Sequence, residues 1–256
     1  MASKSKQSLA IIIPMYNEET VAASCIDAVI KVIKKQKQKI KLIVINDGSK
    51  DTTGEILQKK AQRYGHVLIV LTHKKNKGYG AATQTGIKKA AQLGFTWILH
   101  MDSDLTNDPK YIPKFITSMS DDVDCVKASR YNKGAKTENV PAFRRSVSVI
   151  GNFLAALLFN IGIKDCTNGF RMVRTAMLKG VTFKENNFSI ILEELYYLKK
   201  RHAKFKEIPY TLTARTNSIS HFVYKPKTFY DYLKYVLKAL FLFQVILLTS
   251  QLFVAR

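Results

Sequence analysis

The sequence predicts an α/β fold, in which a mostly parallel sheet carries helices on both of its faces. Short apolar runs alternate with amphipathic stretches through roughly the first hundred residues, and this alternation is typical of repeated strand–helix units. At 256 residues and 46% hydrophobic content, the chain is long enough to bury the core of one large domain. No internal repeat or low-complexity linker indicates a second independent domain.

The first half of the chain carries the clearest pattern. Four apolar runs predict buried strands, at Leu9–Ile13, Ile40–Ile45, Val67–Leu71 and Phe95–Met101. The segments between them predict helices, which begin at Val21, run from Asp51 to Tyr64 and run from Gly80 to Leu93. In the first helix the apolar residues recur at helical spacing, as Val21, Cys25, Val29, Val32 and Ile33.

The alternation loosens beyond Asp104. Helices are expected at Tyr111–Met119, Arg144–Phe159 and Ile190–Arg201, and strands at Val123–Ser129 and Phe205–Leu212. Two polar segments separate these elements, a loop from Arg130 to Pro141 and a glycine-containing turn from Asp165 to Arg171.

The C-terminal segment predicts a helical tail that associates with a membrane. From Phe229 to Leu240 the apolar residues share one helical face, with Asp231, Lys234 and Lys238 off it. The seventeen residues from Ala239 to Ala255 then carry no charge. This run is at the lower limit for spanning a bilayer, which takes roughly 20 residues, so a buried helix, an in-plane helix and a short anchor all remain open. We therefore divide the chain into a folded domain, residues 1–228, and a membrane-associating tail, residues 229–256.

The charge of the chain predicts a polyanionic partner. Its formal net charge of +22 suits nucleic acid, anionic lipid headgroups or a phosphorylated substrate. No nucleic-acid-binding motif accompanies the lysines, so nucleic acid is not expected. The cysteines Cys25, Cys125 and Cys166 form no Cys-x-x-Cys pair, which favours a reduced cytosolic compartment and excludes a zinc site of that type. The apolar run Leu9–Ile13 is too short for a signal peptide, so we expect no export.

Two carboxylates, Asp102 and Asp104, follow the fourth predicted strand. In an open α/β sheet ligands bind beyond the carboxyl ends of the strands, so this pair is expected to face a cleft. Oxygen ligands suit Mg²⁺ or Mn²⁺, and Mg²⁺ commonly takes one or two protein carboxylates together with substrate phosphates. The pair therefore predicts a metal–diphosphate site, whereas alone it would equally fit a solvated Asp-rich turn.

The other strand ends supply groups that complete such a site. Pro14, Tyr16 and Glu18 follow the first strand, Asp47 follows the second, and Lys77 with the Gly78-Tyr79-Gly80 segment follows the third. An acidic loop residue can accept hydrogen bonds from a base or ribose, and a lysine on a glycine-rich loop can approach phosphate. Together these groups predict a nucleoside-diphosphate site.

The order of these motifs resembles a known family. Pro-x-Tyr-Asn-Glu, Asn-Asp-Gly-Ser-x-Asp, Asn-x-Gly-x-Gly and Asp-x-Asp, in this order, are similar to the inverting family 2 glycosyltransferases with the GT-A fold. In the second half, Ala128-Ser129-Arg130-Tyr131, the Arg144-Arg145 pair and the segment from Asp165 to Arg171 are similar to polyprenyl-phosphate hexosyltransferases of the dolichyl-phosphate mannose synthase type. The resemblance runs from about Leu9 to His221.

The resemblance implies roles for individual residues. Nucleoside contacts fall to Pro14, Tyr16, Glu18 and Asp47, ribose or metal contact to Asp102, and direct metal ligation to Asp104. The residues implied to face an acceptor phosphate are Arg130, Arg144 and Ser148. Those implied to lie on a loop near the donor diphosphate are Arg215 and His221, although the family usually has a more basic residue where Ser220-His221 stands.

The resemblance also implies a reaction. A hexose, mannose or glucose, would pass with inversion from GDP-mannose or UDP-glucose to dolichyl or undecaprenyl phosphate, with Mg²⁺ or Mn²⁺, on the cytoplasmic side of a membrane. A phosphate monoester is already largely dianionic at neutral pH and is its own nucleophile, whereas a sugar hydroxyl needs a placed base. The sequence does not name the donor sugar or the lipid.

Of four alternative functions, two conflict with the sequence. A nicotinamide-binding enzyme would carry Gly-x-Gly-x-x-Gly after the first strand, where this chain has Pro14-Met15-Tyr16-Asn17. A processive polysaccharide synthase typically has Gln-x-x-Arg-Trp, and the single tryptophan, Trp97, precedes the Asp pair. A transferase acting on a sugar hydroxyl and a non-enzymatic basic protein that binds nucleic acid or membrane remain as alternatives.

Overall fold

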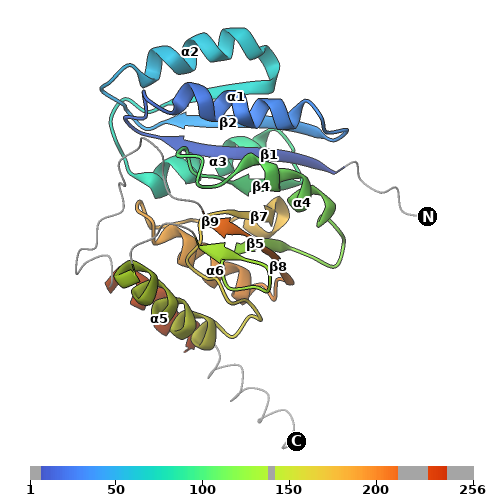
Figure 1. Cartoon of the computed structure of the whole chain (residues 1–256), viewed down its shortest axis with the longest axis vertical. Coiled ribbons are helices and arrows are strands. Elements are labelled where there is room, and N and C mark those ends of the chain that lie inside the picture. Colours follow the sequence, from blue (N-terminus) through green and yellow to red (C-terminus); the bar gives the residue numbers. More distant parts are fainter. Residues whose placement is uncertain (1–6, 138–141, 213–229, 241–256) are drawn as a thin grey trace, which may run out of the picture.

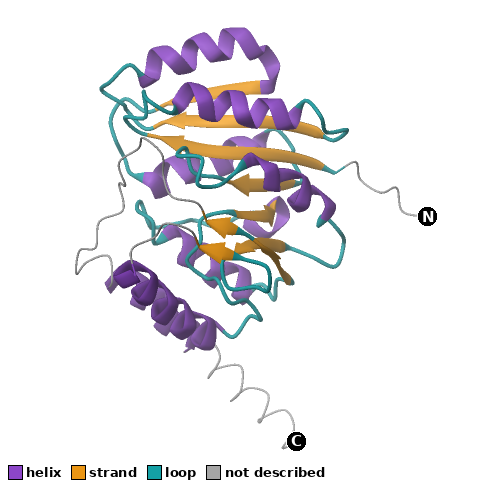
Figure 2. Ribbon diagram, in the orientation of Figure 1, coloured by secondary structure: helices purple, strands orange, loops and turns teal. Residues whose placement is uncertain are grey.

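The computed structural model describes residues 7–137, 142–212 and 230–240 (Figure 1). Its main sheet has seven strands in the order β3-β2-β1-β4-β7-β5-β8, and helices cover both faces (Figure 2), as the sequence predicts. These strands are β1 (Ser8–Met15), β2 (Lys39–Asn46), β3 (Leu68–Thr72), β4 (Trp97–His100), β5 (Cys125–Ser129), β7 (Arg171–Arg174) and β8 (Phe205–Pro209). A small second sheet pairs β6 (Lys136–Thr137) with β9 (Thr211–Leu212).

The helices lie close to their predicted bounds. They are α1 (Ala22–Ile33), α2 (Thr53–Tyr64), α3 (Tyr79–Gln92), α4 (Ile112–Thr117), α5 (Ala142–Phe159) and α6 (Ile190–Lys200). Short 3₁₀ turns are η1 (Gly65–Val67), η2 (Pro109–Tyr111) and η3 (Thr175–Leu178). Residues 230–240 form a further helix.

The N-terminal half places a topological switch beside β1. The chain steps outward from β1 to β2 and β3, then crosses back to add β4 on the other side of β1, with all four strands parallel. In register, Met15 lies beside Asn46 and Ile12 beside His100, so the carboxyl ends of these strands share one edge. Ligands of open α/β sheets bind at such a switch.

Each face of the sheet has its own core. Along β1, Leu9, Ile11 and Ile13 pack into the core beneath α1 and α4, whereas Ala10 and Ile12 pack into the core shared with α3 and α6. Successive side chains of a strand point to opposite faces, and the uniformly apolar sequence of β1 follows from burial on both. The cysteines are buried and free, as their spacing predicts.

The second half differs from the prediction at three points. The expected turn ending at Arg171 instead leads into β7, an antiparallel strand inserted between β4 and β5. The predicted strand Phe205–Leu212 divides into β8 and β9, which join different sheets. The expected loop from Arg130 to Pro141 contains β6. Short strands of two to five residues carry too little periodicity to be recognised, because their pairing depends on remote neighbours.

The helix of residues 230–240 has two faces that the sequence did not separate. Tyr230, Leu233 and Leu237 are exposed, whereas Tyr235 and Val236 are buried against the domain. The predicted single apolar face, with Val236 beside Leu233 and Leu237, is therefore wrong in detail. Most of the apolar run from Ala239 to Ala255 lies outside the described residues. Within 7–137, 142–212 and 230–240, no helix is both long and apolar enough to cross a membrane.

Candidate active site

The predicted donor residues gather along one edge of the sheet. Loops after the parallel strands β1, β2, β3 and β4 all leave from this edge. The antiparallel strand β7 begins here, since Arg171 lies beside both His100 and Lys127. As β5 and β8 also end here, Arg130, which is predicted to face the acceptor phosphate, and the segment before Arg171 reach the same edge.

The loop after β1 is fastened to the loop after β2. The Asn17 amide donates to Ser49 Oγ at 3.0 Å, and the Lys50 amide donates to Asn17 Oδ1 at 2.9 Å. Asn17 adopts a left-handed φ of 53°, which asparagine tolerates better than most residues. Pro14 and Tyr16, the predicted nucleoside contacts, are half-buried at the end of β1.

Asp47 organises the loop after β3. Its carboxylate accepts from the Lys77 amide at 3.0 Å and the Gly78 amide at 2.7 Å, and lies 2.6 Å from His73 Nδ1. Nε2 of His73 lies 2.9 Å from Thr85 Oγ1 in α3. The Lys77 side chain is exposed on the loop so held. Asp47 is buried, so its contact with a nucleoside stays a prediction, whereas its hold on the loop is a contact the sequence analysis missed.

Asp102 and Asp104 stand at the end of β4 in a fixed turn. The Asp102 amide donates to Asn107 Oδ1 at 2.8 Å, and Asp104 Oδ1 accepts from the Thr106 amide at 3.0 Å and its hydroxyl at 2.7 Å. Between the two carboxylates, Ser103 Oγ donates to Glu18 Oε1 at 2.9 Å. Glu18 thus joins the end of β1 to the predicted metal pair.

The electrostatics of this turn suit a divalent cation. Burial raises the pKa of the Cys25 thiol, and the carboxylates of Asp104, Glu18 and Asp102 raise it further, which reveals a concentration of negative charge. In the described part of the chain no group of three or more histidine, cysteine or acidic side chains converges on a metal position. Asp102 and Asp104 would supply two carboxylate oxygens to a bound ion, and such oxygen ligands fit Mg²⁺ or Mn²⁺.

A buried ion cluster lies behind Asp102. Arg171 Nε donates to Glu194 at 2.5 Å, and His100 Nε2 lies 3.3 Å from the same carboxylate. Burial opposes charge on Glu194, but Arg171 and His100 together outweigh it and lower the pKa of that carboxyl. Burial, followed by Arg171, lowers the pKa of His100, so this imidazole is neutral at pH 7. The hydroxyl of Tyr79 faces Asp102 and Arg171; burial and then Asp102 raise its pKa.

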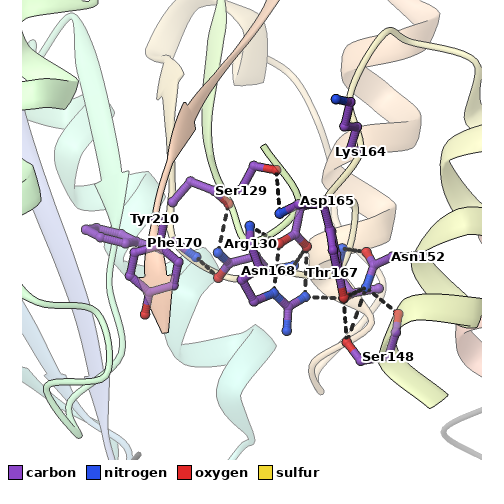
Figure 3. A network of polar contacts seen from close by, with 12 residues as sticks. Ser129, Arg130, Ser148, Asn152, Lys164, Asp165, Thr167, Asn168, Phe170 and Tyr210 are labelled. Carbon is purple, nitrogen blue, oxygen red and sulfur yellow. Dashed lines mark hydrogen bonds and ion pairs between the residues drawn. The ribbon is translucent and has the colours of Figure 1, made fainter. Parts of the chain in front are cut away.

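Arg130 is held by a buried carboxylate (Figure 3). Its Nε and Nη2 donate to the two oxygens of Asp165, each at 2.8 Å, and Nη2 also donates to Thr167 Oγ1 at 3.1 Å. Burial favours the neutral form of both partners, yet their attraction prevails, so the pKa of Arg130 is raised and that of Asp165 lowered. Glu207 orients the turn by accepting from the Lys164 and Asp165 amides, each at 2.9 Å.

The same network reaches Ser148 on α5 (Figure 3). Asn152 Nδ2 donates to Thr167 Oγ1 at 2.8 Å and to the Ser148 carbonyl at 2.9 Å, and Tyr131 Oη lies 3.0 Å from Ser148 Oγ. The predicted acceptor residues Arg130 and Ser148 are therefore joined through Thr167, Asn152 and Tyr131. Arg144 precedes Ser148 by four residues on α5.

Some of the predicted site residues lie outside the described part of the chain. Arg215 and His221 are outside the described residues, as is the side chain of Arg144. The sequence analysis missed His73, Glu194 and Asn152. Asn152 lies four residues after Ser148, and this helical spacing was the one signal that could have indicated it.

The sequence of the chain is similar to those of known proteins. A family model described as "Glycosyl transferase family 2" matches residues 10–182. A dolichol-phosphate mannosyltransferase of Pyrococcus furiosus is 30% identical over 232 residues, which are 89% of this chain but 62% of that protein, so the chain spans less than two thirds of that relative. An uncharacterized protein of Methanocaldococcus jannaschii is 27% identical over 244 residues, covering 90% of this chain and 98% of that protein.

Solved structures share the fold. Glucosyl-3-phosphoglycerate synthase from Mycobacterium tuberculosis, in complex with Mn²⁺, UDP and glucosyl-3-phosphoglycerate, superposes with a TM-score of 0.64 at 19% identity, covering 92% of this chain and 81% of that one. This similarity agrees with the GT-A fold expected from the motifs. Because the family model covers more than half of the chain, this protein belongs to glycosyl transferase family 2 and is a glycosyltransferase.

Proposed function

We propose that the protein transfers a hexose, mannose or glucose, from GDP-mannose or UDP-glucose to dolichyl or undecaprenyl phosphate, with inversion. The observation that carries this proposal is that Asp165, the carboxylate beside Arg130, is already bound by that arginine. This carboxylate is fully buried and accepts two hydrogen bonds from Arg130, which keeps it ionised and out of reach of a substrate proton. An acceptor hydroxyl would need a base beside Arg130, whereas a dianionic phosphate needs none.

The donor would bind along the edge from β1 to β4. Pro14, Tyr16, Glu18 and Asp47 would surround the nucleoside, and the exposed Lys77 would reach the diphosphate. The pair Asp102 and Asp104 would hold Mg²⁺ or Mn²⁺, which supplies positive charge to the diphosphate when bound. Mn²⁺ and UDP in the related synthase structure support this choice of ligands. Arg215 and His221 would add positive charge at the diphosphate.

The acceptor phosphate would bind Arg130, Arg144 and Ser148. An oxygen of the phosphate attacks the anomeric carbon and forms the new C–O bond, while the bond from that carbon to the donor diphosphate breaks. The nucleoside diphosphate leaves with the electron pair, and no proton has to be transferred. The protein's contribution is to hold nucleophile and leaving group in line and to place positive charge near both phosphates.

Exposed apolar side chains support a membrane-bound acceptor. In the described residues, all the exposed large hydrophobic side chains lie on α5 and the helix of residues 230–240. On α5 they are Val149, Ile150, Phe153, Leu154 and Leu157, and Phe153 is 67% exposed. The same helix carries Ser148 and Asn152 on its other side, in the acceptor network. A lipid could therefore leave its chain in the bilayer while its phosphate reaches Arg130.

We further propose that this face, with the basic tail from residue 229 onward, rests on the anionic cytoplasmic surface of a membrane. Lysines near such a surface contribute about 1 kcal/mol each to binding. The 30% identity to a dolichol-phosphate mannosyltransferase supports a polyprenyl phosphate acceptor.

The test is an acceptor panel. Each labelled nucleotide sugar is incubated with Mn²⁺ and one acceptor: short-chain polyprenyl phosphate, a glycolipid with free sugar hydroxyls, or soluble phosphoglycerate. We expect labelled product in the organic phase only when polyprenyl phosphate is the acceptor. Transfer to the glycolipid would favour the hydroxyl alternative, and transfer to phosphoglycerate would favour a soluble acceptor.

A further inference from the structure

A segment outside the predicted motifs connects the C-terminal helix to the donor edge. We call residues Lys184–Ser189 the strap. Its residue Glu185 is buried, and Oε1 accepts from Lys234 Nζ at 2.7 Å and from the Tyr235 hydroxyl at 2.9 Å. Oε2 accepts from Ser189 Oγ at 2.7 Å. A second contact joins Asn187 Nδ2 to Asp231 Oδ2 at 3.0 Å. The strap is thus anchored to the helix of residues 230–240.

The backbone of the strap packs against the first turn of α3 and hydrogen-bonds to it. The Gly80 amide donates to the Asn186 carbonyl at 2.9 Å, and Gln84 Nε2 donates to the Glu185 carbonyl at 2.9 Å. A Cβ atom on Gly78 or Gly80 would overlap the strap backbone, so glycine is needed there for close approach. The rings of Tyr79 and Phe188 stack with centroids 4.5 Å apart.

The first turn of α3 directly follows the loop whose Lys77 and Gly78 amides hydrogen-bond to Asp47. Asp47 accepts from the Lys77 and Gly78 amides on one side, and the strap contacts Gly78 and Gly80 on the other. Neither Lys77 nor Tyr79 can move far while both contacts persist. The Tyr79 hydroxyl also faces Asp102, so the loop that the strap contacts lies next to the predicted metal pair.

We propose that Glu185 is a positioning residue for the donor diphosphate, which ties the Lys77–Gly80 loop to the helix of residues 230–240. This inference rests on the proposed function, because it takes that loop to be the diphosphate contact. The tail helix is then part of the scaffold of the donor site. A substitution on the side of this helix that contacts the strap should therefore alter nucleotide binding. No residue of the helix is itself proposed to contact the nucleotide.

The contacts of Glu185 depend on its negative charge, so an isosteric substitution can test them. Burial disfavours its charge, but hydrogen bonds from Lys234, Ser189 and Tyr235 lower the pKa of the carboxyl, so it is ionised at neutral pH. Glu185→Gln replaces one acceptor oxygen by a donor NH₂ and removes the charge that Lys234 faces. The variant keeps the volume of the side chain but loses part of the anchor.

The chain offers a closely matched control. Asp27 accepts from Lys60 Nζ at 2.7 Å and from the Tyr64 hydroxyl at 2.6 Å, the same pair of partners that Glu185 has. It joins α1 to α2, away from the strap. Asp27→Asn therefore breaks a contact with the same kinds of partner without touching the donor loop, although the Asp27 side chain is 43% exposed and that of Glu185 is 9% exposed.

The experiment measures binding of GDP and of UDP, each with Mn²⁺, by calorimetry on the full chain, together with hydrogen exchange of peptides covering residues 77–84. We expect Glu185→Gln to raise the Kd of the preferred nucleotide about fivefold or more and to speed exchange in these peptides. Asp27→Asn should change neither quantity, and the KM for acceptor should stay constant in both variants. If Glu185→Gln does not fold, Lys234→Met removes the same ion pair from the helix side and should shift both quantities in the same direction.

The outcomes separate the two proposals. Unchanged exchange and unchanged Kd in a folded Glu185→Gln variant would overturn the coupling, as would an equal effect of Asp27→Asn. If the wild-type protein binds neither nucleotide, the proposed function fails and Glu185 has no donor to position. The exchange data then still report whether the strap holds the loop.

Discussion

Replacing Arg130 by alanine should destabilise the protein strongly as well as impair the acceptor site. Asp165 has a fully buried side chain, and Arg130 alone gives it two charged hydrogen bonds of 2.8 Å. Removing one partner of a buried ion pair costs about 3–5 kcal/mol, because the other charge stays buried without compensation. For a chain of this size, 1 kcal/mol shifts Tm by roughly 2–4 °C. We therefore expect a fall in Tm of roughly 6–20 °C at pH 7.

The pH dependence of this loss has a definite sign. In the wild type Arg130 overcomes burial and lowers the pKa of Asp165, so the stability from this pair is present above the ordinary pKa of an aspartate and is lost as the pH falls through the lowered value. Without the Arg130 guanidinium, burial is opposed only by Lys127 and by backbone amides, so the pKa of Asp165 rises. The penalty is then full above the raised value and is relieved on acidification, so the Tm difference should narrow between pH 7 and about pH 4.

Calorimetric unfolding of the wild type, Arg130→Ala and Arg63→Ala across this pH range checks the reasoning. Arg63 is an exposed arginine on α2, and its loss should change the free energy of unfolding by less than about 0.5 kcal/mol. A Tm for Arg130→Ala within about 2 °C of the wild type at pH 7, or a difference that widens on acidification, would refute the account of this pair.

Three further predictions concern metal, acceptor and membrane. Asp104→Ala should abolish metal-dependent transfer with an unchanged circular dichroism spectrum, and chelator should mimic it; near-normal activity with the same Mn²⁺ dependence would exclude Asp104 as a ligand. Arg144→Ala should raise the KM for polyprenyl phosphate by the equivalent of about 1.5–3 kcal/mol and leave the Kd for nucleotide unchanged, whereas equal losses would place Arg144 elsewhere. The Phe153→Glu and Leu157→Glu double variant should float less with anionic liposomes at low salt than the wild type or the charge control Gln58→Glu with Gln62→Glu, and equal flotation would argue against α5 as the membrane face.

The parallel half of the fold was predictable because its signals are local. Each strand from β1 to β4 contains a short, mainly apolar run, and burial on both faces favours such runs in β1, β2 and β4 wherever they lie in the chain. The position of Asp102 and Asp104 after β4 then follows from the end of that run. The grouping of donor residues at one edge follows in turn from the parallel order.

The partners of the charged groups were not predictable, because they are remote in sequence. Arg171 neutralises Glu194 across 23 residues, and Arg130 meets Asp165 across 35. Neither pair has a spacing that a helix or strand would produce. Asp165 lies in the turn before β7 and Arg171 begins it, so both pairs depend on where this short antiparallel strand inserts between β4 and β5, and the sequence did not indicate that strand.

The most direct test of the account compares two acceptors that differ only in the phosphate. Initial rates of transfer of labelled hexose into the organic phase are measured with Mn²⁺ and either a polyprenyl phosphate or the polyprenol of the same chain length. We predict transfer to the phosphate and none to the alcohol, because Arg130 places positive charge in the site and the described carboxylate beside it, Asp165, is already bound by that arginine. Comparable transfer to the alcohol, or no transfer to either lipid while a glycan hydroxyl is glycosylated, would contradict it.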